Sequence, residues 1–127
     1  MSVLVDTSVW LRFMADREPW ATEAADLIGE GRVTAHPLVY GELLIGDRGG
    51  RRELLATFQK FHQATVVAHD EVVALVNLRG LQGRDIGWTD VHLLASALTG
   101  GFRLWTADGP LAEVAHELDV GHRIARR

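Results

Sequence analysis

The sequence predicts an α/β protein in which helices cover both faces of a parallel sheet, giving a three-layer α/β/α sandwich. Two observations indicate this fold class. Short runs rich in β-branched and apolar residues recur along the chain, and longer segments with helical spacing of apolar residues separate them. Such alternation is typical of βαβ units, which pair their strands in parallel and place helices on the faces of the sheet.

The strand candidates are short and mostly apolar. In chain order they are Ser2–Val5, Val33–Ala35, Thr65–Val67, Phe102–Thr106 and His122–Ala125. The helix candidates are longer, and in chain order they are Trp20–Gly29, Pro37–Ile45, Arg51–His62, Glu71–Leu81, Thr89–Leu98 and Pro110–Leu118. Proline is favourable at a first helical position, which supports a helix start at Pro37. Leu54, Leu55, Phe58 and Phe61 recur at spacings of three and four, as on one face of a helix.

Length and composition indicate one soluble domain, spanning residues 1–127, with 47% hydrophobic residues. The chain has no cysteine, which excludes disulfides and thiolate chemistry and fits a reducing compartment. No apolar run approaches the roughly 20 residues that span a bilayer. No basic leader precedes Asp6, as it would in a signal peptide. We therefore expect a cytoplasmic protein with no membrane partner.

The formal net charge of −4 argues against binding nucleic acid mainly by neutralising phosphates, which takes a basic surface. Any such contact must be local, made by arginines or through a cation held by acidic residues. Lys60 is the only lysine among 13 basic residues. The arginines gather in two clusters, which are Arg48, Arg51 and Arg52, and Arg123, Arg126 and Arg127. Arginine suits bidentate phosphate contacts, although such a bias can also reflect genome composition.

Two aspartates directly follow strand candidates. Asp6 comes after Ser2–Val5, and Asp108 comes shortly after Phe102–Thr106. Ligands of open parallel sheets bind outside the carboxyl ends of the strands, so we expect both carboxylates at the same edge of the sheet. Each also has a structural interpretation, because an aspartate before a helix can cap its first N–H groups.

Two further acids lie beside apolar residues on helix candidates. Residues three and four positions apart share a helix face, which groups Glu42 with Leu38, Val39 and Ile45, and Asp90 with Leu93, Leu94 and Ala97. A buried, unpaired charge is costly. For Glu42 the alternatives are an arginine partner in the core or an early end of the helix. For Asp90 the alternative is a place in the first turn after a Thr89 cap, where the helix dipole favours an acid.

Four carboxylates that converge on one pocket would repel one another unless a cation neutralises them. Hard ions such as Mg²⁺ or Mn²⁺ prefer oxygen ligands. Zinc is disfavoured because the six histidines (His36, His62, His69, His92, His116 and His122) are dispersed, and we interpret them as structural or surface residues. A hard ion in such a site supports phosphodiester hydrolysis, since it polarises the phosphoryl oxygen and acidifies a bound water.

The ordered motifs VLVDTSVW, HPLVYGELLIG, GRDIGWTDVHLLASAL and RLWTADGPLAEVA resemble those of PIN-domain proteins. More narrowly, they resemble the VapC ribonuclease toxins of type II toxin–antitoxin (VapBC) modules, over residues 2–120. The resemblance implies a five-stranded parallel sheet between helices. It also implies a Mg²⁺- or Mn²⁺-dependent endoribonuclease that acts on tRNA or rRNA.

The acidic positions of the family correspond here to Asp6, Glu42, Asp90 and Asp108, which are the four acids singled out above. The resemblance implies that all four are catalytic and metal-binding, with Asp6 and Asp90 as the main ligands. A family hydroxyl near the fourth acid corresponds to Thr106, and Thr7 and Ser8 have similar places beside Asp6. These hydroxyls are expected to contact a metal ligand or a phosphate.

The chain departs from the family pattern near the fourth acid. Ala107 stands where many relatives have a basic residue, and Gly109 and Pro110 stand where some have a polar or acidic one. These differences bear on a second metal site and on a local RNA contact, and leave the four acids intact.

The resemblance also implies protein partners. These are a cognate VapB-type antitoxin whose C-terminal segment enters the acidic groove, a second copy of the toxin, and a higher toxin–antitoxin assembly. Some of the apolar residues Trp10, Leu11, Phe13 and Met14 are candidates for lining that groove rather than the core. The four tryptophans, Trp10, Trp20, Trp88 and Trp105, are open to two interpretations, stacking on RNA bases or packing in the core.

Two other functions compete with this one. An aspartate-based phosphotransfer domain also has an acid after its first strand. It needs a lysine late in the chain, where this sequence has only Lys60 in mid-chain, and its phosphatase variant needs a second acid where this sequence has Ser8. The other alternative is a catalytically inactive PIN-fold binding module, although all four acids are retained.

Overall fold

A parallel sheet of four strands forms the centre of the computed structural model, which describes residues 1–124. The strands are β1 (Val3–Val5), β2 (Val33–Ala35), β3 (His62–Gln63) and β4 (Arg103–Trp105). Their order in space is β3-β2-β1-β4, so β1 lies inside the sheet, between β2 and β4. All three residues of β1 are buried, which explains why the strand is apolar without alternation.

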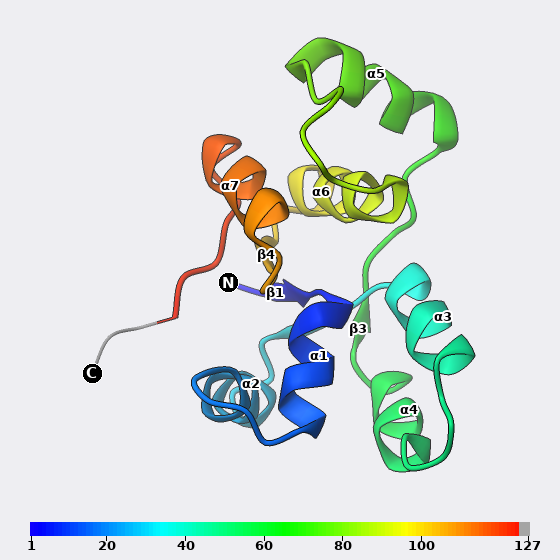
Figure 1. The fold of residues 1–127 in the computed structure, drawn as a ribbon, viewed down its shortest axis with the longest axis vertical. Helices are drawn as coiled ribbons and strands as arrows, with labels where there is room; N and C mark the ends of the chain where they lie inside the picture. Colours follow the sequence, from blue (N-terminus) through cyan, green and yellow to red (C-terminus); the bar gives the residue numbers. More distant parts are fainter. Residues whose placement is uncertain (125–127) are drawn as a thin grey trace.

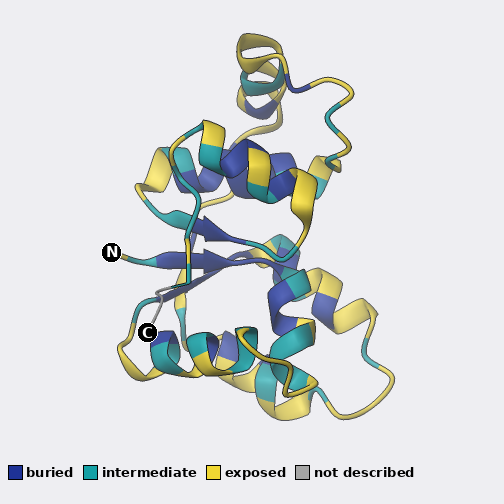
Figure 2. Ribbon diagram, turned by 60° about the vertical axis from the view of Figure 1, so that its left-hand side comes forward, coloured by how far each residue is buried: buried dark blue, intermediate teal, exposed yellow. Residues whose placement is uncertain are grey.

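Seven helices of the described chain surround this sheet, and the predicted α/β fold is confirmed. They are α1 (Thr7–Met14), α2 (Trp20–Gly29), α3 (Pro37–Ile45), α4 (Arg52–Phe58), α5 (His69–Arg79), α6 (Trp88–Gly100) and α7 (Gly109–Glu117). Helices α1 and α2 lie on one side of the sheet, and α6 and α7 lie on the other, with α5 beyond α6 (Figure 1). The buried residues face the sheet from both layers (Figure 2).

The third strand differs from the prediction. Thr65–Val67 was expected, but the strand is His62–Gln63, paired with Thr34 and Ala35 of β2. Pairing ends there because β2 itself ends at Ala35, and the next residue, His36, already caps α3. The Thr65 carbonyl accepts a hydrogen bond from the Ser96 hydroxyl of α6 instead of a strand partner.

The expected fifth strand, His122–Ala125, is wrong for its described residues, and Ala125 lies outside the part that the structure describes. One isolated parallel bridge joins Leu104 to Gly121. Leu104 donates to the Val120 carbonyl, and His122 donates to the Leu104 carbonyl. The segment after α7 thus follows the outer edge of β4 without forming a regular strand.

The core on the α1 side is built around Trp10, which is fully buried. Its ring contacts those of Phe13, Phe58 and Phe61, with centroids 5.7–5.9 Å apart. Of the apolar residues that were candidates for lining a groove, Trp10 therefore belongs to the core, whereas its neighbour Leu11 is exposed. Within residues 1–124 no helix is both long and apolar enough to cross a membrane.

Candidate active site

The four predicted acids come from the carboxyl ends of strands and from helices that start near them. Asp6 follows β1 and caps α1, and Asp108 follows β4 and caps α7. Asp90 lies in the first turn of α6, and Glu42 lies on α3. The capping interpretation of the aspartates is therefore confirmed, although Asp90 caps from the first turn and Gly87, rather than Thr89, is the N-cap residue.

Asp6 is the most enclosed of the four, with 6% of its surface exposed. Its Oδ1 atom accepts a hydrogen bond of 2.7 Å from the Thr7 backbone N–H. Its Oδ2 atom accepts one of 2.8 Å from the Ser8 hydroxyl and one of 2.7 Å from the Thr106 hydroxyl. These three bonds fix the orientation of the carboxylate at the end of β1.

The hydroxyls of Ser8 and Thr106 also accept hydrogen bonds. Ser8 Oγ accepts from the Ala107 N–H at 3.0 Å, and Thr106 Oγ1 accepts from the Asp108 N–H at 3.0 Å. Each hydroxyl has a single hydrogen, which in these bonds is directed to Asp6. The two side chains therefore tie Asp6 to the backbone that leads from β4 into α7.

This network leaves Asp6 one acceptor position toward the site. A carboxylate oxygen has two lone pairs. Both lone pairs of Oδ2 are engaged by hydroxyls, and one of Oδ1 is engaged by the Thr7 N–H. The remaining lone pair of Oδ1 is the one with which Asp6 can bind a cation, so Asp6 is suited to bind through a single oxygen.

The pKa of Asp90 shows that the other three acids are near it. The pKa of its carboxyl is raised above the ordinary value, first by burial and then by the negative charges of Asp6, Asp108 and Glu42. The hydrogen bond of 2.9 Å from the Gly87 N–H to Asp90 Oδ2 acts in the opposite direction. Asp6, Asp108 and Glu42 thus lie near enough to Asp90 for their negative charges to act on its carboxyl.

Glu42 does not lie on an inward face as predicted. It is exposed, and Ile45, expected on the same buried face, has 89% of its surface exposed. Glu42 Oε1 instead accepts a hydrogen bond of 2.7 Å from the Thr7 hydroxyl. The Thr7 hydroxyl therefore positions Glu42, whereas the hydroxyls of Ser8 and Thr106 position Asp6.

The starts of three helices partly offset the repulsion among these acids. The N-cap residues of α1, α6 and α7 are Asp6, Gly87, which lies three residues before Asp90, and Asp108. A helix N-terminus carries about half a positive charge, which favours nearby anions. Asp108 also accepts a hydrogen bond of 3.0 Å from the Leu111 N–H. The backbone of the site is therefore built to hold negative charge.

The donor set fits a hydrated hard cation. Within residues 1–124 no ion pair joins any of the four carboxylates to a basic side chain, so an arginine partner for Glu42 is not found there. In the same part of the chain, no three acidic, histidine or cysteine side chains form a ready-made ligand group. Mg²⁺ commonly keeps several waters and uses one or two carboxylates, which these residues can provide.

Gly87 contacts Asp90 through its backbone, a contact that was not predicted from the sequence. Its N–H is the donor to Asp90 Oδ2, and it stands at the N-cap position three residues before that acid. An acid three residues after a helix N-cap is a known capping pattern, so the spacing in GWTD carried the signal. Gly87 thus orients the Asp90 carboxylate through its backbone.

His36, a buried histidine at the N-cap of α3, is structural. His36 Nδ1 accepts from the Leu38 N–H at 3.0 Å, so Nε2 carries the proton and donates to Ser96 Oγ at 3.1 Å. Ser96 in turn donates to the Thr65 carbonyl at 2.8 Å. Burial, followed by the nearby His92, lowers the pKa of His36 to about 4. This fully bonded chain joins the start of α3 to α6.

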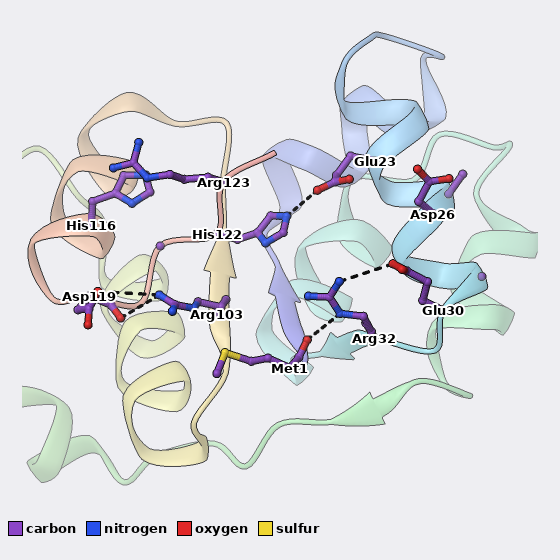
Figure 3. A pocket seen from close by; sticks show the side chains of 13 residues that line it. Met1, Glu23, Asp26, Glu30, Arg32, Arg103, His116, Asp119, His122 and Arg123 are labelled. Atoms are coloured by element: carbon purple, nitrogen blue, oxygen red, sulfur yellow. Dashed lines mark hydrogen bonds and ion pairs between the residues drawn. The ribbon is translucent and has the colours of Figure 1, made fainter. Parts of the chain in front are cut away.

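A cavity of about 1180 Å³ lies at the opposite edge of the sheet, and none of the four acids lines it. Met1 precedes β1, Arg32 precedes β2 and Arg103 begins β4, so these lining residues mark the amino ends of the strands. Figure 3 shows His122 directed at Glu23 across this cavity, where His122 Nε2 and Glu23 Oε2 are joined by a hydrogen bond of 2.8 Å. This pair holds the segment after α7 against α2.

The first predicted arginine cluster is partly committed to the fold. Arg51 donates to the Leu43 carbonyl near the end of α3 at 2.8 Å, while Arg48 and Arg52 are exposed. In the second cluster, Arg126 and Arg127 lie outside the described residues. Among residues 1–124, no arginine of either cluster forms an ion pair with the four acids.

Comparisons with known proteins agree with this geometry. The profile of the PIN domain matches residues 3–117. The chain is 40% identical over 119 residues to ribonuclease VapC32 of Mycobacterium tuberculosis, in both strain CDC 1551 / Oshkosh and strain H37Rv, which covers 93% of this chain and 94% of the relative. The crystal structure of PAE2754 from Pyrobaculum aerophilum is similar with a TM-score of 0.60 and 18% identity, over 89% of this chain and 84% of that one.

Proposed function

The chain belongs to the PIN-domain family, among the VapC-type ribonucleases, and on this premise we propose that it is a Mg²⁺- or Mn²⁺-dependent endoribonuclease toxin. It acts as a single domain in the cytoplasm and hydrolyses phosphodiester bonds in tRNA or ribosomal RNA. One observation carries the proposal: the negative charges of Asp6, Asp108 and Glu42 act on Asp90, and no basic side chain of residues 1–124 forms an ion pair with any of the four.

The acids have separate roles in this proposal. Asp6, through Oδ1, and Asp90 would hold the cation, while Asp108 and Glu42 would complete its acidic surroundings directly or through water. When bound, Mg²⁺ or Mn²⁺ stabilises negative charge on the phosphate and acidifies a water. Thr106 and Ser8 donate to Oδ2 of Asp6, so that oxygen would not be free to bind the ion.

Glu42 is the acid best placed to receive a proton. It is exposed, and the Thr7 hydroxyl holds its Oε1, which leaves Oε2 to orient the attacking water and accept its proton. The water oxygen bonds to phosphorus as the bond to the 3′ oxygen breaks, and the 3′ oxygen takes up a proton. The products are therefore a 5′-phosphate and a 3′-hydroxyl.

A VapB-type antitoxin is the proposed inhibitor. The proposed docking surface, formed by the exposed apolar residues Leu11 on α1 and Leu44 and Ile45 on α3, belongs to two helices in mutual contact. The same two helices carry Thr7 and Glu42, so a segment bound there would reach the acids. A second copy of the chain and a higher toxin–antitoxin assembly complete the proposal, and light scattering of the purified protein with and without antitoxin tests them.

The test of activity uses total bacterial RNA with the purified chain in Mg²⁺, in Mn²⁺ and in excess chelator. We expect cleavage at few sites, new 5′-phosphate ends on sequencing, and no cleavage in chelator. Cleavage that continues unchanged in chelator would contradict the metal requirement. Absence of cleavage with either ion would favour the inactive binding module. Metal-dependent phosphorylation of Asp6 by a small phosphodonor, without RNA cleavage, would favour the phosphotransfer domain.

A further inference from the structure

Trp88 differs from the other three tryptophans in its exposure. Trp10 and Trp105 are buried, and Trp20 is partly covered by the guanidinium groups of Arg12 and Arg17. Trp88 has 44% of its surface exposed. Of the four tryptophans, Trp88 is therefore the candidate for stacking on an RNA base, because its accessible indole can receive another ring.

Two histidine rings hold the Trp88 side chain in place. The His69 ring of α5 lies 5.2 Å from it between centroids, tilted by 54°. The buried His92 ring, one turn further along α6, lies 5.3 Å from it at 88°. An aromatic side chain that is already fixed loses little conformational freedom when a ligand stacks on it, which favours binding.

Trp88 lies at the same end of α6 as Asp90, but its side chain is not one of the acidic group. It is the first residue of α6, directly after Gly87, whose N–H binds Asp90 Oδ2. Two helical positions separate Trp88 from Asp90, which is about 200° around the helix and about 3 Å along its axis. The indole and the carboxylate therefore point to different sides of the same helix end. A strand whose phosphate lies at Asp90 would bring a neighbouring nucleotide, not the cleaved one, toward the indole.

We propose that Trp88 is a stacking surface for one unpaired base of the RNA substrate, in a nucleotide that flanks the scissile phosphate. This inference rests on the proposed ribonuclease function and adds a substrate-positioning residue to it. Unpaired bases in RNA loops are commonly recognised by stacking on aromatic side chains, and tryptophan accepts every base. Stacking on Trp88 would therefore favour RNA with an unpaired nucleotide at one position, whichever of the four bases that nucleotide carries.

The test begins with the RNA that the wild-type chain cleaves in total bacterial RNA. A synthetic copy of the region around the cut is prepared with a single abasic nucleotide at each position in turn. We expect one flanking abasic position to lower kcat/KM of the wild type about fivefold or more. With Trp88→Leu, kcat/KM on the intact RNA should fall by a similar factor, and the same abasic position should cause no further loss. Trp88→Phe retains a ring and should recover most of the loss.

The controls separate stacking from folding and from association. Leu78→Ala removes another exposed apolar side chain, on α5, and should keep the wild-type abasic profile. Thermal unfolding should show Trp88→Leu folded. A Trp88→Leu protein that responds to every abasic position as the wild type does would overturn the inference. A change in oligomeric state with an unchanged abasic profile would also overturn it and assign Trp88 to contact with a second copy. No cleavage by the wild type would overturn the proposed function itself.

Discussion

The Thr106 hydroxyl donates a hydrogen bond of 2.7 Å to Asp6 Oδ2 and so joins the ends of β4 and β1, although 100 residues separate the two in sequence. The same oxygen of Thr106 accepts from the Asp108 N–H. One hydroxyl therefore sets the position of one acid and the backbone of another, and its contribution to activity can be measured.

Replacement of Thr106 by valine should lower activity without unfolding the chain. Valine has a similar shape but cannot donate to Asp6, so the carboxylate loses one of the three hydrogen bonds that fix its orientation. Loss of a partner that orients a metal ligand commonly costs about 10–100-fold in metal affinity or activity. We expect a decrease of this size in kcat/KM and a higher Mg²⁺ concentration for half-maximal rate. Thr106→Ser keeps the hydroxyl and should be close to wild type. Equal activity of the valine and serine variants would contradict this role.

Asp6→Asn and Asp90→Asn should each abolish cleavage while preserving the fold. Asparagine retains an oxygen that can cap a helix but removes the charge that holds a cation. Stabilisation of the transition state by a metal amounts to several kcal/mol, which corresponds to a loss of about 100-fold or more. The matched control is Asp70→Asn, an exposed acid in the first turn of α5. Cleavage assays with thermal unfolding of all three variants make the comparison, and activity in both site variants would sink the assignment.

The raised pKa of Asp90 predicts a stability effect of opposite sign to the activity effect. Between the ordinary carboxyl pKa and the raised folded value, the folded chain binds more protons than the unfolded one, so stability falls as pH rises. Above both pKa values the carboxylate is charged in the folded chain, and its unfavourable contribution to folding stability is complete. Asp90→Asn should therefore raise the Tm at pH 7, and this gain should shrink near pH 4. Thermal unfolding at the two pH values measures the difference, and a Tm below that of wild type at pH 7 would contradict it.

Divalent ions should stabilise the wild type and not the site variants. A ligand that binds only the folded chain adds about 2.7 kcal/mol at a concentration of 100 times its Kd. We expect Mg²⁺ or Mn²⁺ to raise the Tm of the wild type and of Asp70→Asn, with little effect on Asp6→Asn or Asp90→Asn. This readout needs no RNA, so it remains informative if the substrate is not found. An equal Tm increase in all four proteins would place the ion elsewhere.

His36 predicts a loss of stability in mild acid. Its folded pKa is about 4, below the usual value of about 6.5, so only the unfolded chain takes up this proton between the two values. The contribution is complete above pH 6.5 and is lost as pH falls toward 4, by about 3 kcal/mol. His36→Asn keeps a capping oxygen and should show a smaller decrease in the free energy of unfolding between pH 7 and pH 4. The control is His62→Asn, which replaces an exposed histidine. Urea unfolding at the two pH values should show the same decrease in its free energy of unfolding as in the wild type.

The parallel fold and the edge that carries the acids could be predicted because they depend on chain order alone. Alternating strands and helices imply a parallel sheet, and the carboxyl ends of its strands share one edge. Asp6 and Asp108 follow from this rule without any knowledge of packing. The six predicted helix ranges were also correct to within a few residues, apart from the end of α4, which lies at Phe58 instead of His62, whereas α1 was not among the predicted ranges.

The errors arose where one segment depends on another. Helical spacing groups Glu42 with Ile45 but does not tell whether a neighbouring element covers that face, and here Ile45 is exposed. The length of β3 is limited by the end of β2 at Ala35 rather than by the apolar residues Val66 and Val67. Thr7 and Ser8 are equivalent in the sequence, yet the first turn of α1 directs one to Glu42 and the other to Asp6.

The irregular segment beside β4 has a consequence for the behaviour of the sheet in solution. Unpaired strand edges are templates on which other chains can add and aggregate. Leu104 of β4 exchanges hydrogen bonds with Val120 and His122, so this edge is covered, and the Glu23–His122 hydrogen bond holds the covering segment in place. At the other edge β3 has only two residues, too few to template a long intruding strand. Both borders of the sheet are thus protected against self-association by strand addition, and changes at His122 or Glu23 should lower solubility before they affect the distant acids.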